Sequence, residues 1–472
     1  MALYLEQMIA FMRPAFSRQT TYVWFAAAWM GVATRTDAYG VSSLVRALSL
    51  APGAYLLLLH FFHSTAWNAE GIMERWWRWL ATQNVAWELN GRMVFTGDHT
   101  KTPKDARRMP AVTTLHQDSE TASKPSFFRG HHWGCIALVT RAKDRFFSTP
   151  LRAAVHEGLG SLGGPSEEKL PKTVRTVAMA QRAARVMGRA AYLVLDAYFS
   201  VGPVFLAAAA LRGEDSPVIH ILTRAKSNIV AYLPAPPKAP HTRGKQAIYG
   251  GKLKLYHLFE HWADRFTSTT APVYGQPVTV RHLTMDLLWK PVKGYLRFFW
   301  FETPRGRLLL ITSDRNLHPL DALDAYCRRA TIETLFNTLK NVLGGMAYHF
   351  WSKHLERASR RPKKNHTAKQ RSSNRSATLQ ALAAIEKHVN LHLLVLGGLQ
   401  LLAMRFPQEV IDAARCWMRT APKDIPSEFT VKTALTNLIR NNNSGFTKSA
   451  IMRVIRDKRE NPNAIEENSC AA

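Results

Sequence analysis

The spacing of apolar residues changes along the chain. Up to about residue 85 these residues recur at helical intervals, in runs such as 24-WFAAAWM-30 and 74-ERWWRWL-80, which predicts a small all-α domain at residues 1–85. Further on, short runs rich in β-branched and aromatic residues alternate with helical stretches such as 173–188. Strands interleaved with helices indicate an α/β core with a mixed sheet.

The core is expected at residues 86–350. Its predicted strands are 92-RMVFTGD-98, 133-WGCIALVT-140, 192-YLVLD-196, 218-VIHILTR-224 and 308-LLLITSD-314. Between about 228 and 305 the helical spacing is lost, and alternating runs such as 295-YLRFFWFE-302 predict a β-rich insertion. A basic linker is expected at 351–376, followed by a helical region at 377–472.

Positive charge is in large excess. The 472 residues include 63 Lys and Arg against 34 Asp and Glu, a formal net charge of +29. This excess favours a polyanionic partner, with nucleic acid first and an anionic membrane surface second. The longest apolar runs, 54-AYLLLLHFF-62 and 391-LHLLVLGGLQLLAMRF-406, contain His and fall short of the roughly 20 residues of a spanning helix, so no membrane span is expected.

The four cysteines, Cys135, Cys327, Cys416 and Cys470, lie far apart in the sequence. They show neither the paired spacing of a zinc site nor a disulfide framework. This cysteine usage favours a reducing, cytoplasmic setting.

Two predicted strands end in an aspartate, Asp98 and Asp196. A side chain at the carboxyl end of a strand points into the crevice where α/β sheets bind ligands, although a single such aspartate can also begin a turn or cap a helix. A third carboxylate, Glu333, lies on a predicted helix at the border between core and solvent. Three converging carboxylates suit Mg²⁺ or Mn²⁺, and two such ions support phosphodiester chemistry.

The helix predicted at 326-YCRRATIETLFNTLK-340 carries a narrow polar stripe. On a straight α-helix Tyr326, Arg329, Glu333 and Lys340 fall along one line. Taken alone, this stripe is explained by an amphipathic helix with an i,i+4 ion pair between Arg329 and Glu333.

These four residues match the signature Y-x-x-R-x-x-x-E-x-x-x-x-x-x-K in full, and the chain thereby resembles the DDE transposases of bacterial insertion sequences. The stretches 96-TGDHTKTPK-104 and 193-LVLDAYFS-200 are similar to the first and second aspartate strands of that family. One departure is Ala330, which follows the arginine where many relatives carry tryptophan. The resemblance implies a ribonuclease-H-like fold that includes the β-rich insertion.

The resemblance also implies an active site. Asp98, Asp196 and Glu333 would form a metal-binding catalytic triad with two Mg²⁺ or Mn²⁺ ions. Tyr326, Arg329 and Lys340 would grip phosphates and a displaced base near the cleaved end. Residues 1–85 are then expected to bind DNA as well, although packing alone would explain their short helices.

Further DNA contacts are expected outside the signature. Arg224 and Lys226 resemble a basic pair that the family keeps near the DNA, with a solvated edge pair as the alternative. Trp300 is the candidate for stacking on an extruded base, with Trp289 second and core packing as the alternative.

Basic segments are candidates for phosphate contacts, with ordinary solvated loops as the alternative. The candidate residues are Lys101, with Lys104, Arg107 and Arg108 on the same predicted loop, and Arg360, Arg361, Lys363 and Lys364 in the linker. His99, His131 and His132 are interpreted as structural residues rather than metal ligands, because three carboxylates suffice.

The sequence therefore predicts a DNA transposase that cleaves transposon ends and joins their 3′ ends to target DNA. The resemblance implies a homodimer assembled on DNA, no membrane partner, and a bacterial, nucleoid-associated location in the cytoplasm. Two alternatives stay open: a metal-dependent nuclease of the same fold without strand transfer, and a domesticated, non-catalytic DNA-binding repressor.

Overall fold

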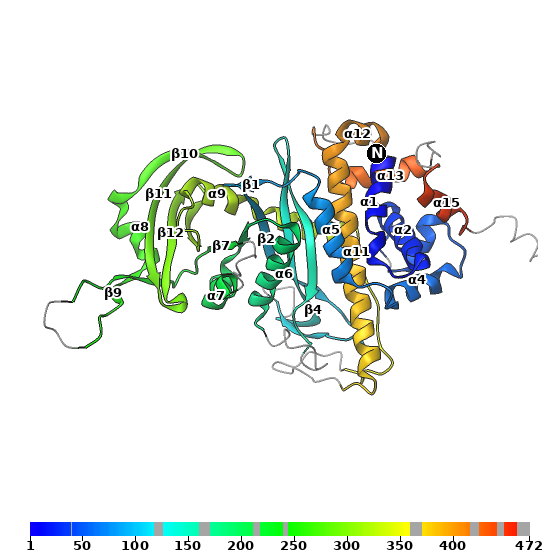
Figure 1. The fold of residues 1–472 in the computed structure, drawn as a ribbon, viewed down its shortest axis with the longest axis horizontal. Coiled ribbons are helices and arrows are strands. Elements are labelled where there is room, and N and C mark those ends of the chain that lie inside the picture. The colour runs from blue at the N-terminus through cyan, green and yellow to red at the C-terminus, as the bar shows by residue number, and fades with distance from the viewer. Residues whose placement is uncertain are drawn as a thin grey trace, which may run out of the picture.

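Helices and strands separate into a long sheet and a helical layer beside it (Figure 1). The computed structural model describes residues 1–38, 40–117, 126–159, 170–210, 218–238, 244–358, 371–415, 424–440 and 448–459. In these ranges thirteen strands form one sheet with parallel and antiparallel pairs. The predicted α/β class with a mixed sheet is confirmed.

The middle of the sheet is built from five strands in the order β5-β4-β2-β6-β7. They are β2 (Arg92–Pro103), β4 (Phe127–Ala142), β5 (Arg145–Val155), β6 (Ala191–Leu195) and β7 (Ile219–Arg224). Strands β5, β4 and β2 pair antiparallel, whereas β6 and β7 continue the sheet parallel to β2. The parallel connections run through α6 (Lys172–Met187) and α7 (Gly202–Ala210). Two short strands, β1 (Glu88–Leu89) and β3 (Thr113–His116), pair with β2 and β4.

Side chains of β2 alternate between two cores. Met93 and Phe95 join the larger core, which also holds apolar residues of α6, α7 and the helical layer. Val94 points to the opposite face and packs with residues of α9 (Pro319–Arg328). Because successive residues of a strand face opposite sides of the sheet, β2 is held from both faces and its end has a fixed position.

A second set of strands extends the sheet at one end (Figure 1). It comprises β8 (Val230–Pro234), β9 (Tyr249–Lys254), β10 (Thr267–Val273), β11 (Gln276–Trp289), β12 (Gly294–Thr303) and β13 (Gly306–Thr312), with the short helix α8 (Leu258–His261). Strand β13 pairs antiparallel with β7, so this region continues the same sheet. It occupies the place of the predicted β-rich insertion at 228–305 and extends beyond it. The run 308–314 was predicted as a core strand, but β13 pairs antiparallel with β12 and joins this region to β7.

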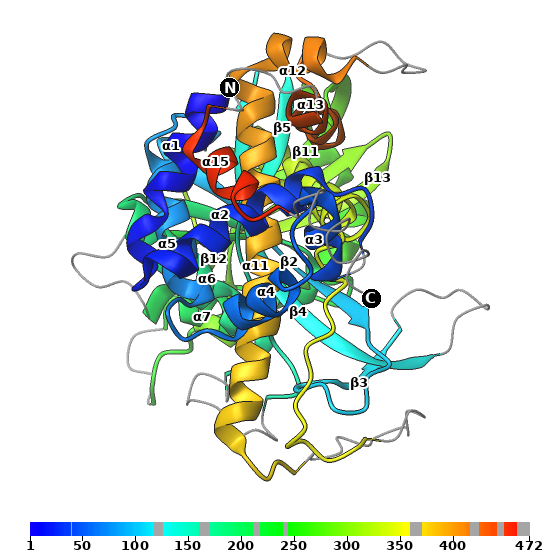
Figure 2. The ribbon, with the colours of Figure 1, turned by 90° about the vertical axis from the view of Figure 1, so that its right-hand side faces the viewer.

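Helices from both ends of the chain form the helical layer (Figure 2). The N-terminal helices are α1 (Ala2–Phe11), α2 (Gln19–Thr34), α3 (Ser42–Leu48), α4 (Ala54–His63) and α5 (Ala69–Ala81). The C-terminal helices are α11 (Arg375–Arg405), α12 (Pro407–Ala414), α13 (Glu428–Arg440) and α15 (Ala450–Arg456). Helix α11 contacts α2, α4 and α5 as well as β5, and most of its residues from Ala381 onward are buried. The predicted domain boundaries stay a prediction, but the two terminal regions share one core.

Helix α2 is buried on nearly every side. Its run from Trp24 to Thr34 is packed between neighbouring helices, which explains its lack of a polar face. A helix surrounded in this way offers no face to a DNA groove. Helix α2 is therefore not available to read a DNA groove. The DNA-binding role of residues 1–85 stays a prediction.

A buried guanidinium ties the helical layer to the segment after α9. Arg35, at the end of α2, is 1% exposed and donates to Gly40 O at 3.1 Å and Ser43 Oγ at 2.7 Å. It also donates to Leu343 O and lies 2.8 Å from His392 Nε2. Burial lowers its pKa to about 10. Arg35 forms no ion pair with any of the described residues.

The predicted straight helix over 326–340 is wrong. Helix α9 ends at Arg328, α10 spans Thr331–Asn337, and a π-helical turn follows over Thr338–Val342. The side chain of Thr331 donates to Arg328 O at 2.7 Å, and Ile332 N reaches back only three residues to Arg329 O. This local bonding replaces the regular i→i−4 pattern and interrupts the helix at Arg329.

No single helix in the described ranges is both long and apolar enough to cross a membrane, and the pair α11 and α12, bent by 104°, reaches such a composition only when counted together.

A buried histidine makes the fold sensitive to acid. His131 on β4 lies within 2.8 Å of Pro110 O through Nε2 and within 2.7 Å of Tyr348 Oη through Nδ1. Because Pro110 O only accepts, Nε2 carries the proton and Nδ1 accepts from Tyr348. Burial lowers the pKa of His131 to about 4, against an ordinary value of 6.5.

We expect stability to fall as the pH drops from 6.5 towards 4, because the unfolded chain takes up a proton that folded His131 refuses. Above pH 6.5 His131 is neutral in both the folded and the unfolded chain and costs no stability. Below pH 4 the free energy of unfolding is lower by about 3 kcal/mol, at 1.36 kcal/mol per pKa unit. His131→Gln, which keeps a donor and an acceptor, should flatten this decline in thermal melts between pH 7.5 and 4.5. Exposed His261→Gln is the control, and equal pH slopes for both variants would contradict the prediction.

Candidate active site

Asp98 lies near the middle of β2. There β2 pairs with β4 and continues beyond its last pair with β6, at Thr96. Asp98 Oδ1 accepts from His99 N at 2.7 Å, and the Asp98 side chain is 18% exposed. The preceding Gly97 allows a close approach of β6, since a Cβ there would meet Leu195 at 2.8 Å. The local packing therefore presents the Asp98 carboxylate at the point where β6 ends.

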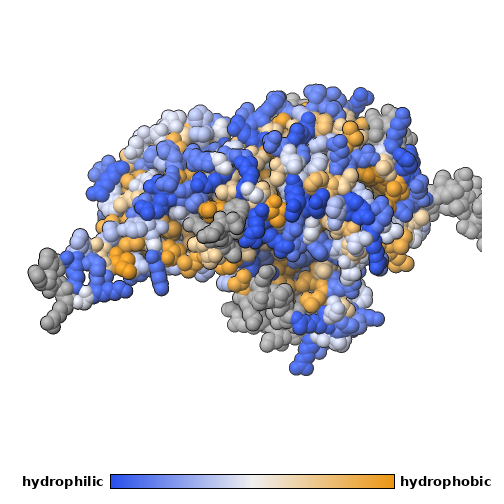
Figure 3. Space-filling view, in the orientation of Figure 1, coloured by the Kyte–Doolittle hydropathy of each residue, from blue (hydrophilic) through white to orange (hydrophobic). Residues whose placement is uncertain are grey.

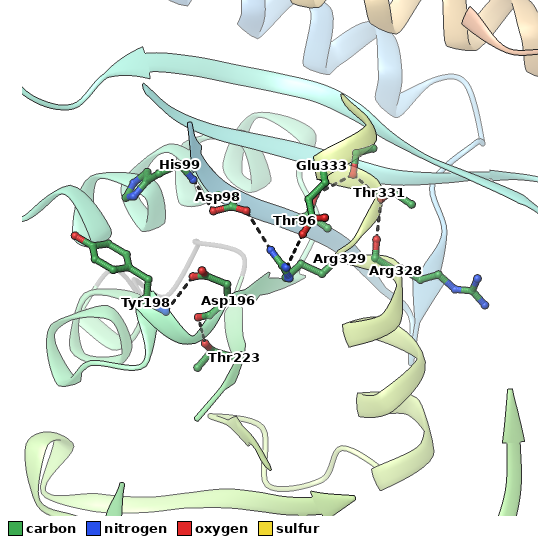
Figure 4. Close-up of polar contacts among 11 residues, drawn as sticks. Thr96, Asp98, His99, Asp196, Tyr198, Thr223, Arg328, Arg329, Thr331 and Glu333 are labelled. Carbon is green, nitrogen blue, oxygen red and sulfur yellow. Dashed lines mark hydrogen bonds and ion pairs between the residues drawn. The ribbon is translucent and has the colours of Figure 1, made fainter. Parts of the chain in front are cut away.

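Asp196 follows the last residue of β6 and begins a short 3₁₀ turn, Ala197–Phe199. Its Oδ1 accepts from Tyr198 N at 3.1 Å, and its carbonyl oxygen accepts from Thr223 Oγ1 at 2.6 Å (Figure 4). The side chain therefore caps the turn, as the structural alternative for a strand-end aspartate predicts. The carboxylate still lies beside Asp98, because β2 and β6 are parallel neighbours.

Arg329 connects the carboxylates. Its guanidinium donates to Asp98 Oδ2 at 3.1 Å and to Glu333 Oε1 at 3.0 Å (Figure 4). The Arg329 side chain is 15% exposed, whereas Glu333 is 63% exposed. The predicted i,i+4 pair therefore exists, and it is one half of a bridge that reaches across to β2.

The three carboxylates are close enough for the charges of Asp196 and Glu333 to act on Asp98. The pKa of Asp98 is raised to about 6 by burial first and by the charge of Asp196 second, with a smaller contribution from Glu333. Arg329 opposes this rise. Burial also raises the pKa of Asp196. Carboxylates that repel one another in this way form a site for positive charge.

A chain of hydroxyl groups fixes α10 against the sheet. Ser148 Oγ on β5 lies 3.1 Å from Thr96 Oγ1 on β2 and 2.7 Å from Thr331 Oγ1 on α10. This chain joins the strand that carries Asp98 to the helix that carries Glu333. It holds both residues without using their carboxylates.

The signature residues Tyr326 and Lys340 also lie near these elements. The Arg329 guanidinium lies 5.9 Å from the Tyr326 ring centre. Lys340, in the π-helical turn, donates to Thr100 Oγ1 at 2.6 Å and to Lys101 O at 3.3 Å, and burial lowers its pKa. Lys340 thus fastens the segment after α10 to β2, two residues beyond Asp98.

The basic pair on and after β7 lies close to the carboxylates. Both Arg224 and Lys226 are exposed. The charge of Lys226 acts on the pKa of Asp196, and that of Arg224 acts on the pKa of Tyr326. Their predicted contact with DNA stays a prediction, but their position beside the site fits it.

Trp300 does not fit its predicted contact with an extruded base. It is fully buried, and its Nε1 donates to Leu255 O at 2.7 Å. Trp289 is 5% exposed and packs edge-on against Phe205. In both positions the ring is surrounded by protein, as the core-packing alternative predicts.

The basic residues predicted to contact phosphates lie in different surroundings. Lys101 donates to His116 O at 2.8 Å. The linker candidates Arg360, Arg361, Lys363 and Lys364 lie outside the described residues. Lys104 is buried, and its Nζ donates to Met346 O at 2.5 Å and to Tyr348 O at 3.1 Å, which excludes it from a phosphate in this conformation.

The histidines near the site have structural partners. His99 Nε2 lies 3.1 Å from Thr176 Oγ1, and the ring packs against Phe199. Burial lowers the pKa of His99 to about 3, so the ring is neutral. His132 pairs with Glu157 at 2.9 Å. These partners agree with the interpretation of His99, His131 and His132 as structural residues.

The chemistry of the donor set fits a divalent cation. Asp98, Asp196 and Glu333 offer oxygen ligands, as Mg²⁺ and Mn²⁺ require. Arg329 now bridges Asp98 and Glu333, and within the described parts of the chain no three His, Cys, Asp or Glu side chains are grouped to hold a metal ion as they stand. Exposed Glu333 would have to rotate for all three carboxylates to share an ion.

No protein-family model matches the chain, and no curated protein matches it. The geometry of the site therefore carries the functional argument without support from relatives.

Several positioning residues were not predicted from the sequence. Ser148, Thr331 and Thr223 supply the hydroxyl contacts described above, and their spacing along the chain gives no signal of their convergence. Arg329 was predicted as a phosphate contact, but not as a partner of Asp98. The one local signal was Thr331, whose residue type favours a break in a helix.

Proposed function

We propose that this protein is a DNA transposase that cleaves transposon ends and joins the 3′ ends to target DNA. The observation that carries the proposal is the convergence of Asp98, Asp196 and Glu333 from three separate elements around Arg329. A fully matched signature adds to it, spread over α9, α10 and the π-helical turn that follows. Carboxylates that are partly buried side by side are costly without positive charge next to them, and such clusters are frequent at functional sites.

The arrangement of the sheet supports a ribonuclease-H-like core. Three antiparallel strands followed by two parallel ones, with the carboxylates on β2, just after β6 and on the later α10, are consistent with that fold. The insertion β8–β13 lies between the second aspartate and the glutamate, as the resemblance implies.

The residues of the chain have separable tasks in this proposal. Asp98, Asp196 and Glu333 would hold two Mg²⁺ or Mn²⁺ ions. Such ions lower the pKa of a bound nucleophile and stabilise a leaving oxygen. Arg329 holds Asp98 and Glu333 in place beforehand, and with cations bound to the carboxylates its guanidinium would be available to a DNA phosphate. Lys340, Arg224 and Lys226 add positive charge beside the site.

The partners follow from charge and chemistry. A net charge of +29 favours DNA at physiological salt, where neutralised phosphates release counterions. Joining two ends to a target calls for two active sites, so the working form is proposed to be a homodimer on DNA. The proposed setting is the nucleoid of a bacterial cytoplasm.

The deciding experiment uses a plasmid that carries the coding region with its flanking DNA, where a mobile element would have inverted repeats at its ends. The purified full-length chain is incubated with this plasmid, a target plasmid and Mg²⁺, and the products are sequenced across new junctions. Joined 3′ ends would support a transposase. Cut ends without junctions would support the metal-dependent nuclease, and binding without cutting would support the repressor.

A further inference from the structure

The segments that carry Asp98 and Glu333 stay together beyond the active site. After β2 the chain runs through Arg107 and Arg108, and after α10 it runs through Trp351 to Ala358. Ser352 N donates to Arg108 O at 3.0 Å, and Ala358 N donates to Arg107 O at 2.8 Å. These bonds make the two segments a continuous extension of the site.

This extension contains a cavity of about 350 Å³. Its walls include Arg107, Arg108, Met109, His349, Trp351 and Arg357. Apart from the buried Lys104, the two segments 104–109 and 349–358 carry the basic residues Arg107, Arg108, Lys353 and Arg357 against the acidic Asp105 and Glu356. The cavity therefore combines positive charge with an aromatic ring.

Trp351 is unusual among the tryptophans. Its side chain is 60% exposed, and it is the only tryptophan of the described ranges in the exposed class. Core packing does not account for this side chain, because an exposed indole leaves most of its apolar area in water. A flat aromatic face beside guanidinium groups matches a nucleobase with its phosphates.

We propose that this cavity binds an unpaired nucleotide of DNA, with the base stacked on Trp351 and its phosphates held by Arg107 and Arg357. The inference rests on the proposed function for its choice of DNA as the ligand. Strand β2 continues for five residues beyond Asp98, to Pro103, which is roughly 17 Å at about 3.3 Å per residue. The residues that line the cavity begin at Ala106, after the end of β2, so the cavity is separate from the carboxylates. It is also separate from the buried Trp300, which does not line it.

The test measures binding of the full-length chain to a labelled 20-nucleotide oligo-dT and to an abasic deoxyribose-phosphate oligomer of the same length, in EDTA. The parent should prefer the oligomer that has bases. Trp351→Ala should weaken oligo-dT binding by roughly 5- to 150-fold, the range that base stacking supplies, and leave abasic binding unchanged. Trp351→Phe should restore most of the preference.

Salt dependence separates stacking from charge. Trp351→Ala should leave the slope of log K against log salt unchanged, whereas Arg357→Ala should reduce it by about 0.7. Phe429→Ala is the matched control, because Phe429 is 61% exposed on α13, away from the cavity. Melting curves of all variants exclude unfolding as the cause.

Two results would overturn the proposal. They are oligo-dT binding by Trp351→Ala equal to that of Phe429→Ala, and an equal loss of binding on both oligomers. Because cleavage is not measured, failure of the transposase assay would leave this result standing, and failure here would leave the carboxylate site untouched.

Discussion

Asp98→Asn, Asp196→Asn and Glu333→Gln are each expected to lower DNA cleavage by roughly 10³-fold or more, since the charge that a metal ion stabilises in the transition state is worth several kcal/mol. Each replacement keeps the shape of the side chain but removes a carboxylate from the cluster around Arg329. Binding of end DNA should be retained, because the basic surface is unchanged. Cleavage rates and gel-shift affinities measured in parallel check both statements.

The matched control is Asp144→Asn, which makes the same chemical change at a fully exposed side chain on the turn between β4 and β5. It should cleave like the parent. Normal cleavage by any of the three cluster variants would remove that residue from the proposed mechanism. Loss of DNA binding together with cleavage would point to misfolding instead, which melting curves would reveal.

Arg35→Leu is expected to destabilise the protein by about 1–3 kcal/mol, because the Leu343 carbonyl loses its donor in a buried setting, whereas Gly40 O keeps the Ser43 hydroxyl as a donor. Each orphaned acceptor costs about 1–3 kcal/mol, and removal of a buried charge offsets part of this loss. Urea unfolding at neutral pH measures the change. Because Leu343 ends the segment that follows Glu333, cleavage should also fall in conditions where the variant remains folded.

Arg78→Leu on α5 is the control for this change. Arg78 is exposed, and its replacement should alter stability by no more than about 0.5 kcal/mol. If Arg35→Leu were as stable as Arg78→Leu, the contact between the helical layer and Leu343 would have no structural role.

The edges of the active site were predictable because they depend on local pattern. Asp98 and Asp196 follow runs of β-forming residues, and the parallel pairing of β2 with β6 brings the two aspartates together. The prediction that Asp98 ends its strand is wrong, because β2 pairs with β4 as far as Pro103. Contacts between distant segments were not predictable in this way. The bond between Arg329 and Asp98 joins residues 231 positions apart, so only the i,i+4 half of the Arg329 bridge had a signal in the sequence.

Two errors have identifiable physical causes. The helix over 326–340 breaks because the Thr331 hydroxyl bonds to Arg328 O, and a calculation of helical angles does not include this competition. The stretch 298-FFWF-301 is apolar at every position, so alternation does not reveal which face each ring covers. Trp300 lies in the larger core and Phe299 and Phe301 lie in the smaller one, so both faces of β12 are buried (Figure 3 shows only the outer surface of this region).

The sharing of one helical layer by both ends of the chain has a consequence for synthesis on the ribosome. Helix α2 cannot bury its apolar surface against α11 until residue 405 has left the ribosome. At about 5–20 residues per second, the roughly 370 residues between them take about 20–75 s. During that time the surface of the Trp-rich N-terminal helices that α11 covers is exposed to solvent. We therefore expect the nascent chain to bind chaperones throughout this interval. A chain truncated before α11 is expected to aggregate.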